Sequence, residues 1–139
     1  MIYVEEKDFS RQLDLIRAIS NAERSSFCAW LYPESKAENI AGWRVQKSNL
    51  EAVTTYGDNV TPSHTELVNC SEGVIVSVSR AKNDVVAHCD SLVLYKLGAT
   101  QWFTAVVGHE GMCLVRDDAL SSLLQQAGFK VSSEPKNWW

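Results

Sequence analysis

The stretch Val106–Cys113, with the sequence VVGHEGMC, comes closest of any in the chain to a catalytic motif. His109 and Glu110 match the first half of the zinc-protease pattern H-E-x-x-H, and Cys113 stands where the second histidine would be. That pattern needs a helix, which projects side chains four residues apart from one face. Two glycines flank the pair, and each disfavours a helix interior by about 1 kcal/mol. The window therefore predicts a β-hairpin with His109 and Glu110 exposed at its tip, where alanine substitutions should leave stability nearly unchanged.

The segment His88-Cys89-Asp90 is the second candidate for chemistry. Neighbouring side chains of a strand point to opposite faces, so His88 and Asp90 could share a face that excludes Cys89. Free cysteines are among the most buried residues, which favours a structural role for the thiols. A zinc site made from Cys70, Cys89, Cys113 and a histidine would have a spacing that matches no known signature. No glycine-rich phosphate motif or G-x-S-x-G is present. We therefore assign no catalytic residue, metal or cofactor.

Five tryptophans are an unusually large number for a chain of 139 residues. Trp30 and Trp102 fall within predicted strands and are expected in the core, whereas Trp43 lies in an irregular segment. Trp138 and Trp139 end the chain after a polar stretch, so they must either fold back onto the domain or meet another protein. The residues that we expect to contact a partner are Trp43, His109, Glu110, Asp117, Asp118, Trp138 and Trp139.

The elements that would position these residues follow from hydrophobic periodicity. An apolar stripe with a capping aspartate predicts a helix over residues 8–23, and a second stripe predicts a helix from Asp117 or Asp118 to a left-handed Gly128. A capping-box pattern at Ser48 suggests a short helix that ends before Gly57. Strands are expected at residues 1–4, 25–33, 66–70, 73–80, 101–107 and 112–116, with a short closing strand through residues 129–131. Residues 85–97 are expected to hold one long strand or two short ones. The result is one α+β domain over residues 1–139. It has an antiparallel sheet of about five or six strands, with the N-terminal and C-terminal helices packed on one face.

Composition limits the partners. The chain has 139 residues and a net charge of −4, with no cluster of basic residues along the sequence to bind phosphates, so direct nucleic-acid binding is not expected. No secretion signal or apolar run long enough for a membrane span is present, and the four cysteines form no C-x-x-C pair. These features favour a reducing, cytoplasmic setting. The mild acidity favours a partner with a basic surface.

A small, compact, acidic protein without a catalytic motif is similar in outline to bacterial immunity proteins and other small inhibitors. That resemblance of size and character implies a non-catalytic protein that neutralises a toxin or enzyme by covering its basic active-site cleft. A small enzyme that uses His109, Glu110, His88 and Cys89 in acid–base or thiol chemistry is the first alternative. A phage anti-defence inhibitor or a homo-oligomeric regulatory domain is the second.

Overall fold

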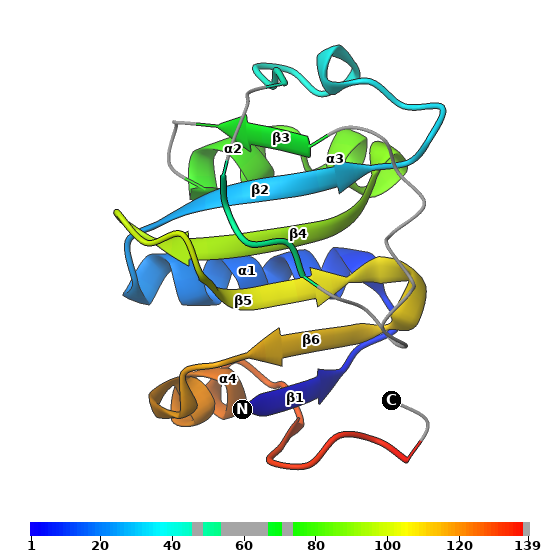
Figure 1. Cartoon of the computed structure of the whole chain (residues 1–139). Helices are drawn as coiled ribbons and strands as arrows, with labels where there is room; N and C mark the ends of the chain where they lie inside the picture. The colour runs from blue at the N-terminus through cyan, green and yellow to red at the C-terminus, as the bar shows by residue number, and fades with distance from the viewer. Residues whose placement is uncertain (46–48, 54–66, 71–73, 138–139) are drawn as a thin grey trace.

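The computed structural model describes residues 1–45, 49–53, 67–70 and 74–137 (Figure 1). Within these residues, seven strands form one antiparallel sheet in the order β3-β2-β4-β5-β6-β1-β7. The strands are β1 (Ile2–Glu5), β2 (Ser25–Leu31), β3 (Leu67–Cys70), β4 (Cys89–Lys96), β5 (Trp102–Val107), β6 (Met112–Val115) and β7 (Val131–Ser132). The α-helices are α1 (Phe9–Ala22), α2 (Val74–Arg80), α3 (Lys82–His88) and α4 (Ser121–Gln126). Three short 3₁₀ helices are η1 (Ala37–Asn39), η2 (Gly108–Glu110) and η3 (Asp118–Leu120).

Helix α1 connects β1 to β2 across the sheet. Four antiparallel pairings separate these two strands, so they run in the same direction, and parallel strands need a crossover such as a helix. The Asp8 side chain accepts a hydrogen bond from the Ser10 N–H and caps the helix, as its sequence predicts. Leu13, Ile16 and Ile19 are fully buried beneath it. The predicted N-terminal helix is confirmed.

The two faces of the sheet carry separate apolar cores. Leu92 and Leu94 of β4 pack in the larger core, to which the four described α-helices contribute side chains. Figure 1 shows α1 lying across the sheet. Val93 and Tyr95 point the other way into a smaller core with Trp102. This alternation is the period-two pattern of a strand that is buried on both faces. The predicted α+β fold with an antiparallel sheet is confirmed.

Residues 49–53 cover part of the smaller core as an irregular strap. The Tyr95 hydroxyl donates to the Glu51 carbonyl oxygen over 2.6 Å, and the Glu51 carboxylate accepts from Arg116 over 2.8 Å. The Arg116 guanidinium also lies 3.6 Å from the centroid of the Trp102 ring. The short helix expected from Ser48 is not formed over residues 49–53, and the rest of that prediction lies outside the described residues.

One strand prediction was wrong, and a second placed the start of its strand too early. Residues 74–80 form helix α2, and residues 82–88 form helix α3 before β4 begins at Cys89. Alternating valines and serines indicated a strand, but Val74 and Val78 also form an apolar stripe on α2, and they are buried with Val85 of α3 in the core beneath α1. Packing of that stripe outweighs the intrinsic preference of β-branched residues for strands. In the described ranges, no helix is long and apolar enough to span a membrane.

Candidate functional site

The turn between β5 and β6 is the hairpin that the glycines predict. Residues 108–110 form the 3₁₀ helix η2, and Gly111 adopts a left-handed conformation with φ of 63°. A Cβ atom on Gly108 would lie 2.6 Å from the backbone oxygen of Asp90, so only glycine lets the turn approach β4 this closely. The turn is therefore packed against the start of β4 rather than projecting into solvent.

Asp90 anchors His109 through two hydrogen bonds. Its carboxylate accepts from the His109 backbone N–H over 3.1 Å and contacts the ring Nδ1 over 2.8 Å. A third donor, the Ser91 hydroxyl, lies 2.7 Å from the same carboxylate. The Asp90 side chain is 5% exposed, whereas that of His109 is 38% exposed. A buried carboxylate thus fixes the orientation of an accessible imidazole.

Glu110 lies against the other ring nitrogen. Its Oε1 atom is 3.5 Å from His109 Nε2, and its side chain is only 10% exposed. The expectation that both residues are exposed at the tip holds for His109 and is wrong for Glu110. The cause is the 3₁₀ turn, which brings the Glu110 side chain close to the imidazole. With Nδ1–H donated to Asp90, Nε2 is the ring atom able to accept or release a proton, as in a general acid or base.

The other residues considered for chemistry lie apart from this pair. His88 ends α3, and its Nδ1 lies 2.9 Å from the Ser35 hydroxyl. Cys89 is buried, and burial raises the pKa of its thiol, as it does for Cys113. The two thiols therefore lack the exposure and the thiolate character that nucleophilic chemistry needs. Burial and the charge of Asp90 also raise the pKa of the Tyr32 hydroxyl.

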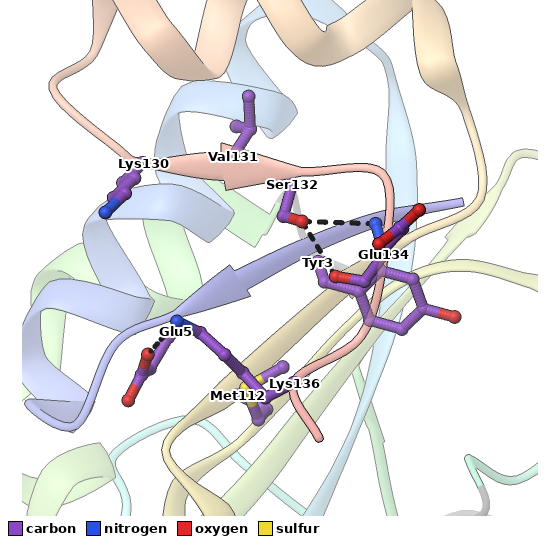
Figure 2. Close-up of a pocket in the computed structure, with 8 residues that line it drawn as sticks. All are labelled: Tyr3, Glu5, Met112, Lys130, Val131, Ser132, Glu134 and Lys136. Carbon is purple, nitrogen blue, oxygen red and sulfur yellow. Dashed lines mark hydrogen bonds and ion pairs between the residues drawn. The ribbon is translucent and has the colours of Figure 1, made fainter. Parts of the chain in front are cut away.

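The C-terminal tail forms a second candidate site on the β1–β7 edge. After β7 the chain turns at Ser132, whose hydroxyl donates to the Glu134 carbonyl oxygen over 2.7 Å. Lys136 then reaches back to the Glu5 carboxylate over 2.9 Å (Figure 2). Together with Tyr3, Met112 and Val131, these residues line a pocket of about 100 Å³. The pocket has an apolar floor and an ion pair on its rim.

A second hollow lies at the start of β1. It has a volume of about 290 Å³, and Asp118, Ile2 and Ser133 are among the residues that line it. The Asp118 carboxylate is 76% exposed and pairs with the N-terminal amine over 3.1 Å. Asp117 caps η3 and pairs with Lys96. We call the strip that carries both hollows, from the Glu5–Lys136 pair to Asp118, the β1–β7 edge surface.

The predicted partner residues do not gather at one place. His109 and Glu110 precede β6, whereas Asp117 and Asp118 follow it, so the two pairs lie at opposite ends of that strand (Figure 1). Trp43 is 5% exposed and its ring packs 5.2 Å from that of Phe27, so it is not a surface anchor. Trp138 and Trp139 lie outside the described residues.

Asp90 and Lys136 are two of the site residues that reasoning from sequence missed. Asp90 was considered only with His88, because its real partner His109 lies 19 residues away and meets it through the pairing of β4 with β5. Lys136 gave no signal, because its ion pair with Glu5 joins opposite ends of the chain. The register of the β4–β5 pair would have indicated Asp90. Ser91 lies opposite Val107, so Asp90, which precedes Ser91, lies beside the turn that follows Val107.

No protein-family model, curated protein or solved structure matches this chain. The fold class and the two candidate sites therefore stand on the geometry alone. Among the residues that the structure describes, no three histidine, cysteine or acidic side chains are grouped so that they could hold a metal ion.

Proposed function

We propose that this protein is a non-catalytic inhibitor that binds another protein through the β1–β7 edge surface and covers a basic cleft on it. The observation that carries the proposal is the small apolar pocket between β1 and the returning tail (Figure 2). A pocket of about 100 Å³ can accept one apolar side chain but not a cofactor or a drug-sized ligand. Single anchoring side chains in such pockets dominate many protein interfaces.

The charges that line the two hollows balance, with Glu5, Glu134 and Asp118 against Lys130, Lys136 and the N-terminal amine. The preference for a basic partner therefore rests on the net charge of −4 and on the exposed carboxylate of Asp118. Among the described ion pairs at this edge, Asp118 is the most exposed acid, and it pairs with the N-terminal amine. Rim charges of this kind raise association rates and select partners, while the buried anchor supplies affinity. The buried cysteines Cys28, Cys89 and Cys113 agree with the reducing, cytoplasmic compartment that we propose for the complex.

Site-specific photo-crosslinking in cells of the native host tests the proposal. A benzoylphenylalanine at Ser132 should give one defined crosslinked protein, and the same label at the exposed Leu97 should not. The captured protein should then form a stoichiometric complex with the purified chain and lose its own activity. If Ser132 crosslinks only to a second copy of the chain, a homo-oligomeric domain replaces the inhibitor.

A pocket-filling variant gives the second test. Ser132→Leu places a larger side chain beside the pocket, so it should weaken the complex about tenfold or more. Loss of the exposed hydroxyl bonds to Glu134 should lower the free energy of unfolding by no more than about 1 kcal/mol. The matched variant is Ser122→Leu, on an exposed position of α4 that lies outside the pocket. Equal affinities for the two variants would place the interface elsewhere.

The Asp90–His109 pair favours a second candidate, a small enzyme that uses His109 as a general acid or base. This alternative predicts hydrolysis of activated esters or phosphoesters that is lost in His109→Gln. The same change at His88 should leave the activity intact, since that imidazole is bonded to Ser35 instead. Absence of turnover above the buffer rate in the unmodified protein rejects the enzyme.

A further inference from the structure

A third surface gathers basic side chains that are scattered in the sequence. Arg11 and Arg17 lie on α1, and Lys82 begins α3. All three approach the carboxylate of Asp14: Lys82 lies at 2.9 Å, and each arginine lies at 3.8 Å. The sequence shows no basic cluster, because Lys82 is far along the chain from the two arginines. The three residues meet only because α3 packs beside α1.

The two arginines flank a groove between α1 and the end of α4. The groove has a volume of about 310 Å³, and Asn21 and Phe129 are among its lining residues. The Arg11 guanidinium stands 4.8 Å from the centroid of the Phe129 ring, which is itself 5% exposed. A fixed aromatic face therefore orients one arginine before any ligand arrives.

The guanidinium groups retain capacity for hydrogen bonds. In the described part of the chain, the carboxylate contacts of Arg11 and Arg17 measure 3.8 or 3.9 Å, which is too long for hydrogen bonds. Asp14 is instead hydrogen-bonded to Lys82. Of the residues that line the groove, Arg11 and Arg17 are cationic and Asp14 is anionic, so the lining carries one positive charge in excess.

We propose that this groove binds an acidic segment of a partner protein, with a carboxylate held between Arg11 and Arg17. Paired N–H donors of a guanidinium match the two oxygens of a carboxylate, which makes arginine the usual residue for this recognition. The groove is shallow and open on one side, as suits a side chain that another macromolecule presents. The net charge of −4 disfavours a long polyanion such as a nucleic acid, whereas a short acidic segment meets only the local field.

The probe is an end-blocked hexaglutamate peptide, titrated into the ¹⁵N-labelled full chain at low salt. Binding should shift the side-chain Nε–Hε signals of Arg11 and Arg17. Arg17→Gln should weaken binding about tenfold, which is the loss of one charge-assisted pair. Asp14→Asn should tighten binding, because it removes the carboxylate that competes for the same donors. A role of these residues in stability alone would not produce that gain.

Arg80→Gln is the matched control, since Arg80 is exposed on α2 and does not line the groove. It should change affinity less than twofold. Arg17→Lys keeps the charge but loses the planar donor pair, so an intermediate affinity is expected even if Arg17→Gln is poorly folded. The proposal is overturned if neither arginine signal moves at millimolar peptide, if Arg80→Gln weakens binding as much as Arg17→Gln, or if a hexathymidine oligonucleotide binds the groove more tightly than the peptide.

Discussion

The buried carboxylate of Asp90 accepts the Nδ1–H of His109 over 2.8 Å and joins the β5–β6 turn to the start of β4. The pair gives the turn a structural partner that a hairpin tip in solvent would lack. It also presents His109 Nε2 in one orientation, whether the site serves a partner contact or proton transfer.

Removing the imidazole should destabilise the protein, contrary to the expectation for an exposed tip. His109→Ala leaves the buried Asp90 carboxylate without one of its donors, which should cost about 1–3 kcal/mol in the free energy of unfolding. Urea denaturation of His109→Ala and of the parent protein measures this change in the free energy of unfolding. Leu97→Ala, at a position 57% exposed, should stay within about 0.5 kcal/mol of the parent. A His109→Ala variant as stable as Leu97→Ala would show that the hydrogen bond contributes nothing.

The close approach of the turn to β4 gives a prediction for Gly108. In Gly108→Ala the new Cβ would meet the Asp90 backbone oxygen at 2.6 Å, so the turn must move away, at a cost of about 1–3 kcal/mol. The His109 ring signals in an NMR spectrum should shift with it. Gly98→Ala is the control, because its Cβ meets nothing within 4 Å and its only cost is a φ of +80°. That variant should lose stability and leave the His109 signals in place.

The Glu51–Arg116 pair predicts part of the acid sensitivity. The hydrogen bond from Arg116 holds the pKa of Glu51 below its usual 4.5. The stabilisation that the Glu51–Arg116 pair contributes is therefore complete above pH 4.5, and it is lost as the pH falls through the lower pKa that Glu51 has in the folded state. Both side chains are more than a third exposed, so the contribution should not exceed about 1 kcal/mol. Arg116→Gln should flatten the loss of stability between pH 5 and pH 3, measured by urea denaturation. A parallel pH profile for the variant would contradict the pairing.

Buried thiols make a prediction about reactivity. In a Cys70→Ser variant, the remaining Cys28, Cys89 and Cys113 are all buried, and burial raises the pKa of the last two. None should react with a disulfide reagent at pH 8 while the protein is folded, and all should react in guanidinium chloride. One thiol that reacts within seconds in the folded protein would revive the thiol chemistry that the structure disfavours.

Local patterns were enough to predict the long elements. The apolar stripe of α1 and its Asp8 cap, the strands on either side of the Gly108–Gly111 turn, and the left-handed Gly128 after α4 depend on contacts within a few residues. Helices α2 and α3 could not be assigned in this way. Their valines fit a strand and a helix equally well locally, and only the core beneath α1 decides between the two.

The candidate sites likewise combine features that local sequence predicts with features that depend on tertiary contacts. The turn at His109 and Glu110 could be predicted from local sequence, because two glycines and strand-forming flanks disfavour a metal-binding helix. Three other features depend on tertiary contacts: Asp90 fixes His109, Trp43 is buried, and the tail returns to Glu5. These contacts join residues far apart in the chain, and their geometry is set by strand register and helix packing. Neither leaves a local signature.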